Sequence, residues 1–124
     1  MMTDDIFLYD TYALVEIFNK NPKYETYIDK DIIINEFIFA EFCYKLFLYG
    51  VENAQEYIEE IVTAVVIPTN GVIEKAMLFR AKNKHKNMSV TDCISYFQAK
   101  ELGIKFLTGD KEFETMEHVE FVKK

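Results

Sequence analysis

Four carboxylic acids, Asp10, Glu41, Asp92 and Asp110, stand where a predicted strand ends or along a predicted helix. Asp10 and Asp110 each follow a short apolar run. Asp92 opens a predicted helix, and Glu41 interrupts the apolar segment 37–49. Acids that meet in one site repel one another and raise one another's pKa values, so such a site requires a hard cation such as Mg²⁺ or Mn²⁺. A bound divalent ion would open metal-assisted chemistry to this cluster.

Each acid also has a purely structural explanation. Asp10 can cap the helix that follows it, and Asp92 fits a capping-box pattern at a helix start. Glu41 has Lys45 four residues later, which is a common pairing on solvated helix faces. Asp110 fits a strand-to-helix turn. These explanations stay open for each acid alone, while the four positions together favour a common site.

The elements that would position these acids alternate along the chain. Strands are predicted at residues 6–9, 32–34, 65–67, 105–107 and 119–122, and helices at residues 11–19, 22–28, 36–49, 53–63, 72–83 and 91–102. Gly50 and Gly103 are placed to end helices. The order predicts an α/β fold, a three-layer α/β/α sandwich with a mostly parallel central sheet. In such a sheet the acids at the strand ends would converge on one crevice.

Composition narrows the class of protein. At 124 residues, half of them hydrophobic, the chain fits one domain over residues 1–124. The net charge of −7 argues against broad adhesion to nucleic acid, although it does not exclude a nucleic-acid enzyme. The only histidines are His85 and His118, which makes a zinc site improbable. Cys43 and Cys93 are predicted to be buried thiols, because nothing in the sequence resembles a secretory leader. We therefore expect a soluble, cytoplasmic protein without a membrane span.

Three parts of the sequence carry a family resemblance. Residues 8–11 read as a strand ending in Asp-Thr, and residues 40–42 place a Glu on the helix after the second strand. The C-terminal signature is the most specific part, with an Asp-bearing helix start at 89–92, then 98–103, then a strand ending in Asp within 106–113. On these segments the chain resembles the PIN-domain ribonucleases over nearly its full length. Among them it is most similar to the VapC toxins of prokaryotic VapBC toxin-antitoxin pairs.

The resemblance implies a metal-dependent endoribonuclease that leaves 5′-phosphate and 3′-hydroxyl ends and is held in check by an antitoxin. It implies a catalytic, metal-binding quartet of Asp10, Glu41, Asp92 and Asp110, with Thr11 and Thr108 as supporting hydroxyls and Glu112 near enough to stand in for the fourth acid. The cofactor would be Mg²⁺ or Mn²⁺. An RNA-processing PIN nuclease that is not a toxin, and a non-enzymatic binding module of the same fold, remain alternatives.

Two further features concern partners. Residues 80–87 carry four positive charges and no acid, and we expect Arg80, Lys82, Lys84 and Lys86 to follow an RNA backbone, with a solvated loop as the alternative. The surplus of Phe and Tyr, and a helix at 37–49 that is apolar nearly all round, predict a homodimer and a second face for an antitoxin.

The sequence argues against two other classes of α/β protein. A receiver domain of two-component signalling needs an Asp after its third strand, where this chain has Pro68-Thr69-Asn70. Phosphate-binding nucleotide enzymes need a glycine-rich loop, and none follows a predicted strand.

Overall fold

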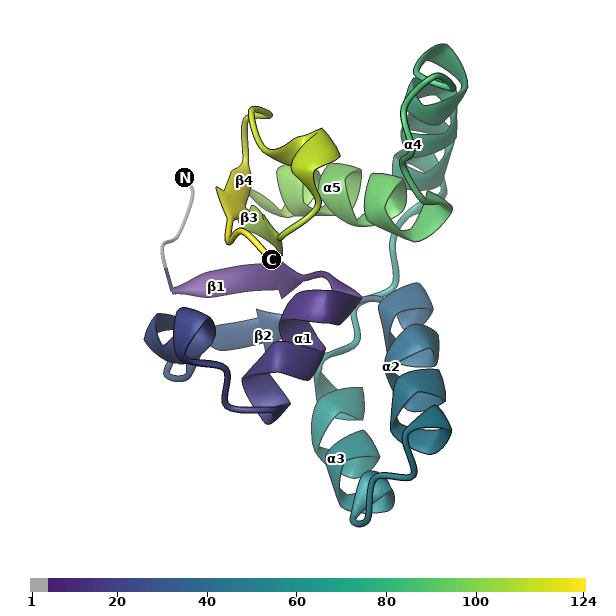
Figure 1. Ribbon diagram of the computed structural model, residues 1–124. Coiled ribbons are helices and arrows are strands. Elements are labelled where there is room, and N and C mark those ends of the chain that lie inside the picture. Colours follow the sequence, from purple (N-terminus) through teal and green to yellow (C-terminus); the bar gives the residue numbers. More distant parts are fainter. Residues whose placement is uncertain (1–4) are drawn as a thin grey trace.

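A sheet of four parallel strands forms the centre of the computed structural model, which describes residues 5–124 (Figure 1). The strands lie in the order β2-β1-β3-β4 and have the bounds Ile6–Tyr9 for β1, Asp31–Ile33 for β2, Lys105–Thr108 for β3 and Val119–Phe121 for β4. The first four residues of the predicted domain lie outside the described part. Tyr9 is the register partner of Leu107, so the carboxyl ends of β1 and β3 lie side by side.

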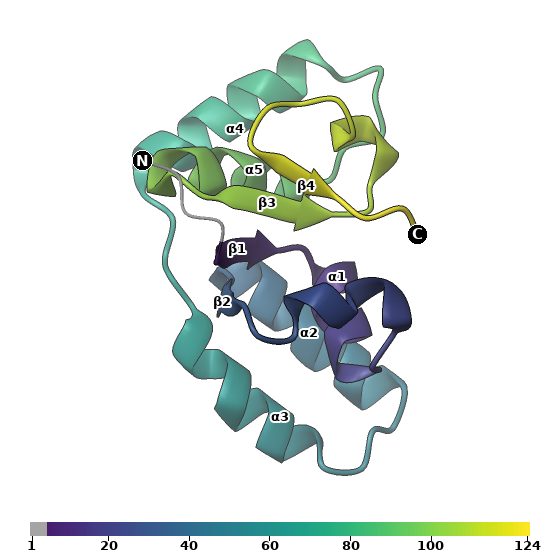
Figure 2. The same cartoon turned by 90° about the vertical axis from the view of Figure 1, so that its left-hand side faces the viewer.

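Helices flank the sheet on both sides (Figure 2). The α-helices are α1 (Thr11–Phe18), α2 (Glu36–Leu48), α3 (Ala54–Ile61), α4 (Asn70–Lys82) and α5 (Val90–Leu102), and the 3₁₀ turns are η1 (Pro22–Tyr27), η2 (Val62–Ala64) and η3 (Lys111–Phe113). The sheet extends from β1 in both directions, so right-handed crossovers place α1 and α5 on opposite faces. α4 packs on α5 and α3 packs on α2, at opposite ends of the molecule (Figures 1 and 2). The predicted three-layer α/β/α sandwich is confirmed.

The two central strands are continuous apolar runs because helices cover both of their faces. Leu8, Tyr9, Phe106 and Leu107 are completely buried, and Phe42 of α2 joins the same core. Such a core leaves polar side chains at the strand ends as the exceptions that need an explanation.

The two cysteines are free thiols, as predicted. Cys93 is buried in α5 as expected, whereas Cys43 of α2 is only half-buried. None of the helices within residues 5–124 combines the length and the apolar character that crossing a membrane requires.

The predicted strand at 65–67 is wrong. Only Val65 pairs there, as an isolated parallel bridge to Ile34, and Val66 and Ile67 are exposed. The 3₁₀ turn η2 brings the chain to this edge, and Pro68, which cannot donate a ladder hydrogen bond, follows at once. Residues 65–67 therefore have the apolar composition of a strand, but only Val65 pairs with a neighbouring strand segment.

The predicted helix at 22–28 is a 3₁₀ turn, η1, capped by the side chain of Asn21. Tyr27 of η1 connects this turn to the sheet, because its hydroxyl donates to Glu120 of β4 at 2.6 Å and its carbonyl accepts from the Tyr9 hydroxyl at 3.3 Å.

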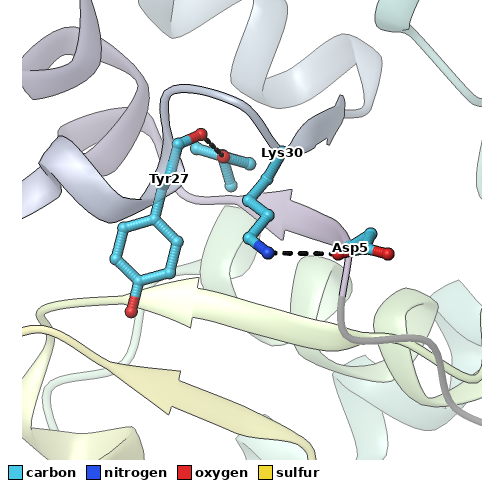
Figure 3. A network of polar contacts seen from close by, with 4 residues as sticks. Asp5, Tyr27 and Lys30 are labelled. Atoms are coloured by element: carbon cyan, nitrogen blue, oxygen red, sulfur yellow. Dashed lines mark hydrogen bonds and ion pairs between the residues drawn. The ribbon is translucent and has the colours of Figure 1, made fainter.

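Figure 3 shows the Tyr27 phenol reaching toward the strands and the ion pair between Lys30 and Asp5, whose atoms are 3.1 Å apart. Asp5 and Lys30 precede β1 and β2, so this pair lies at the opposite end of the sheet from Asp10.

Candidate active site

Asp10 lies at the junction of β1 and α1 and is only 4% exposed. Its Oδ1 accepts a hydrogen bond from the amide of Ala13 at 2.7 Å, which caps α1, and its Oδ2 accepts from the hydroxyl of Thr108 at 2.6 Å. Burial raises the pKa of Asp10, while the hydroxyl of Thr108, the amide of Ala13 and the charge of Lys124 act in the opposite direction. The capping explanation is therefore correct, but it engages only one carboxylate oxygen of Asp10.

Thr108 connects the first acid with the fourth. Its hydroxyl donates to Asp10 and accepts from the amide of Asp110 at 3.1 Å. Asp110 in turn accepts from the amide of Glu112 at 3.0 Å and so begins η3. Thr108 thus bonds to both acids, whereas Glu112 contacts Asp110 through its backbone amide, and the supporting roles of the two residues stay a prediction.

Glu41 lies on the exposed side of α2 and accepts a hydrogen bond from the hydroxyl of Thr11, the first residue of α1. The alternative partner Lys45 forms no ion pair with it among residues 5–124, and the Lys45 ammonium instead lies 5.8 Å from the centre of the Tyr49 ring. Glu41 therefore faces the start of α1 and the site of Asp10.

Asp92 is in the first turn of α5, whose N-terminus is capped by the Ser89 hydroxyl accepting from the Asp92 amide at 3.0 Å. Burial, followed by the negative charges of Asp10, Asp110 and Glu41, raises the pKa of Asp92 to about 7. Three of the predicted acids are thus close enough to act on the carboxyl group of the fourth, although the four come from two helices, one turn and one strand end.

One cleft of about 730 Å³ opens over this group of acids. Asp10, Glu41 and Asp92 line it, whereas Asp110 does not. The rest of the lining within residues 5–124 comes mainly from α1 and α2, with Ser89 before α5 and Lys124 after β4. Three of the four predicted acids therefore share an open cleft, and Asp110 adjoins it through Thr108.

The chemistry of these donors fits a hard cation. All four are carboxylates, and the repulsion that raises the pKa of Asp92 is removed when a cation binds. In the described part of the chain, however, no three His, Cys, Asp or Glu side chains stand together as a ligand cluster. Asp10 is hydrogen-bonded to Ala13 and Thr108, and Glu41 to Thr11. The ligand roles of the quartet stay a prediction.

The basic residues predicted to contact RNA lie apart from the cleft lining. Arg80 and Lys82 end α4, and Lys84 and Lys86 follow in the exposed loop that returns to the start of α5 (Figure 1). The Arg80 guanidinium donates to the carbonyl of Met88 at 3.0 Å and so braces that loop. The loop reaches the cleft only at Ser89, and RNA contact by the four cations stays a prediction.

Sequence reasoning missed two parts of the site. Asn35 precedes α2, caps it by accepting from Ile38 at 3.0 Å, and donates to Ser95 and Gln98 of α5 at 3.0 Å each. An Asn between an apolar run and a helix signals such a cap, but its ties to α5 depend on the fold. The second missed residue, Lys124, has no signal in the sequence, because only the path of the chain after β4 brings it into the cleft.

The fold and the acidic cleft at its strand ends define an α/β domain of the kind that binds its ligand in a crevice beyond the carboxyl ends of parallel strands. A model of the PIN domain family matches residues 7–119, and the chain belongs to that family. PIN domains are generally nucleases.

Solved structures support the same fold. The chain superposes on a protein chain from a toxin-antitoxin complex of Klebsiella pneumoniae with a TM-score of 0.79, over 95% of this chain and 98% of that chain, at 16% sequence identity. No curated protein matches the sequence. The resemblance expected from the three sequence segments is thereby confirmed at the level of the family.

Proposed function

We propose that this protein is a divalent-metal-dependent endoribonuclease and the toxin of a toxin-antitoxin pair. The observation that carries the proposal is the gathering of acids around Asp92, which shares one cleft with Asp10 and Glu41 and whose pKa is also raised by the charge of the adjoining Asp110. A bound cation would remove this repulsion, whereas without one Asp92 relieves it by keeping a proton. Membership of the PIN domain family supports a nuclease over other uses of such a cation.

The residues of the cleft suit hydrolysis without a covalent intermediate on the protein. The Thr11 hydroxyl donates to Glu41, and the Ser89 hydroxyl caps α5. Burial raises the pKa of the Cys93 thiol to about 11, so this cysteine is a poor nucleophile. An Mg²⁺ or Mn²⁺ ion held by Asp10, Glu41, Asp92 and Asp110 would activate water and stabilise negative charge on the phosphate oxygens. Thr108 would keep Asp10 ionised and oriented toward the cleft.

Partners are proposed from the surface of α2. Four large apolar side chains near its C-terminal end are 55–67% exposed, and we call them the α2 patch: Tyr44, Phe47, Leu48 and Tyr49. Exposed apolar patches of this kind mark protein interfaces. The similar fold of the toxin-antitoxin complex chain supports an antitoxin as one partner, and a second copy of this chain is the other. Both would meet the protein in the cytoplasm.

A nuclease assay tests the proposed function. Purified protein, freed from any copurifying partner, is incubated with labelled single-stranded RNA in the presence of Mg²⁺ or Mn²⁺, and parallel reactions contain a chelator. We expect cleavage that requires the ion, yields 5′-phosphate ends and is lost in Asp92→Asn and Asp10→Asn. The matched control is Asp29→Asn, an exposed acid on the turn before β2.

Two results would contradict the proposal. Chelator-resistant cleavage would rule out the ion, and wild-type rates in either active-site variant would rule out the quartet. A protein that binds RNA or an antitoxin with normal affinity but never cleaves would instead be a binding module of the PIN fold.

A further inference from the structure

Lys124 is a cation inside an acidic cleft. It lines the same cleft as Asp10, Glu41 and Asp92, and it lies near enough to Asp10 for its charge to act on that carboxylate. Within residues 5–124, however, its ammonium forms no ion pair with any acid. The ammonium nitrogen instead lies over the ring of Tyr12, 4.7 Å from the ring centre. The ammonium therefore lies against an aromatic face, close to Asp10 but without a direct ion pair to an acid of residues 5–124.

The chain after β4 is fastened so that Lys124 reaches this position. The amide of Val122 donates to the carbonyl of Thr108 at 3.0 Å, and the ammonium of Lys23 donates to the carbonyl of Lys123 at 3.4 Å. These two bonds attach the segment to β3 on one side and to η1 on the other. The segment is thereby led over the loop that carries Asp110.

Gly109 makes this path possible. A Cβ atom at position 109 would lie 2.7 Å from the carbonyl oxygen of Val122 and 2.8 Å from Cγ of Lys124. Only a residue without a side chain at position 109, between Thr108 and Asp110, lets residues 122–124 approach the backbone so closely. The close contact between Gly109 and the C-terminal segment therefore allows Lys124 to reach the cleft.

An RNA nuclease with a net charge of −7 needs local positive charge where the phosphate enters. Among the described residues lining the cleft, the cations are Lys45 and Lys124, and Lys45 lies against Tyr49 on α2. The four basic residues at 80–86 do not line it. Lys124 is the cation beside Asp10.

We propose that Lys124 is a substrate-positioning residue, which binds a backbone phosphate of single-stranded RNA next to Asp10. The inference rests on the proposed nuclease function and adds to it a residue outside the acidic quartet. Lysine suits the role as a compact point charge with three donors, and the ring of Tyr12 restricts the freedom of its side chain.

Steady-state cleavage of a short single-stranded RNA by Lys124→Met, Lys124→Arg and Lys123→Met tests the proposal. Methionine removes the charge and keeps the length of the side chain. Lys123 is the matched control, since it is exposed, adjacent and does not line the cleft. We expect KM to rise about fivefold in Lys124→Met with kcat nearly unchanged, and to return toward the wild-type value in Lys124→Arg. Equal KM values in Lys124→Met and Lys123→Met would overturn the proposal.

A binding measurement separates this inference from the proposed function. Fluorescence anisotropy of labelled single-stranded RNA is recorded at several salt concentrations, with Asp92→Asn as the background so that the RNA stays intact. Loss of one phosphate contact lowers the steepness of log affinity against log salt by about 0.7. In the Asp92→Asn background we expect this change when Lys124→Met is added and not when Lys123→Met is added. An unchanged slope, or tighter binding, overturns the role of Lys124. Absence of cleavage by the wild-type protein overturns the nuclease instead.

Gly109→Ala provides a second test through the path of the chain. Its Cβ displaces Val122 and Lys124, so KM should rise as it does in Lys124→Met. In the double variant the two effects should not add, because both act through one contact. Additive effects would mean that position 109 acts on Asp110 and not on Lys124.

Discussion

The hydroxyl of Thr108 lies 2.6 Å from Oδ2 of Asp10, although the two residues are 98 positions apart in the sequence. The same hydroxyl oxygen accepts from the amide of Asp110 at 3.1 Å. One buried side chain thus connects the end of β1 with the loop that follows β3. Because a buried carboxylate is stabilised by each hydrogen bond it accepts, this contact keeps Asp10 ionisable at low exposure.

Thr108→Val should therefore destabilise the protein by about 1–3 kcal/mol, because it removes a hydrogen-bond partner from the buried carboxylate of Asp10 and from the partly buried amide of Asp110. It should also raise the pKa of Asp10 further, since the Thr108 hydroxyl now counteracts the effect of burial. Urea denaturation measures the first effect. Thr108→Ser keeps the hydroxyl and is the matched control, with an expected cost well below that of valine. Equal stability of the valine and serine variants would contradict the role of the hydroxyl.

Asp92 should make the metal-free protein less stable as the pH rises. Its pKa is raised from 3.8 to about 7, first by burial and then by Asp10, Asp110 and Glu41. Between these two values the folded protein keeps a proton that the unfolded chain has lost, so the free energy of unfolding falls with rising pH and levels off above about 7.

Asp92→Asn should consequently stabilise the protein by ~2–4 kcal/mol at about pH 8 and by much less at about pH 5. Thermal denaturation in the presence of a chelator measures the difference. The exposed Asp29→Asn is the control and should show no such pH dependence. A gain in Tm that is the same at both pH values would contradict the raised pKa of Asp92.

Divalent ions should reverse this effect in the wild-type protein. An ion bound by the folded state alone stabilises it by about 2.7 kcal/mol when its concentration is one hundred times Kd. We therefore expect Mg²⁺ or Mn²⁺ to raise Tm at about pH 8 in the wild type and to leave Asp10→Asn and Asp92→Asn nearly unchanged. Calorimetric titration of the ion provides an independent Kd. An equal rise in Tm in all three proteins would place the ion elsewhere.

The sequence was sufficient for the parts of the site that depend on local pattern. Asp10 and Asp110 follow apolar runs that are predicted as strands and form the central strands β1 and β3, and a parallel sheet brings such strand ends together. Asn35, Lys124 and the isolated pairing of Val65 depend on contacts between distant segments. No local pattern encodes which residue a buried Asn contacts, where a chain runs after its last strand, or whether an apolar triplet finds a partner.

The contacts of Asn35 supply a further prediction, since they connect the N-terminus of α2, the helix of Glu41, to α5, the helix of Asp92. Asn35→Ala removes the cap of α2 and leaves the polar atoms of Ser95 and Gln98 without a donor. We expect a loss of about 2–4 kcal/mol in urea denaturation. Asn53 precedes α3 without a side-chain capping bond, so Asn53→Ala is the matched control and should cost little. Similar costs for the two variants would show that the contacts to α5 contribute nothing.

The α2 patch should mediate association of two copies of the chain. Phe47 is 64% exposed and lies among the other large apolar side chains of that patch, and an interface built there would bury apolar area that water otherwise covers. A charge in the middle of such an interface has no partner, so Phe47→Glu should convert a dimer into a monomer. Sedimentation at micromolar concentration measures the change. Leu78→Glu, which alters a 58% exposed side chain on α4, is the control and should remain dimeric. A wild-type protein that sediments only as a monomer would contradict the dimer, whereas the cleavage assay on the same sample would still decide the nuclease.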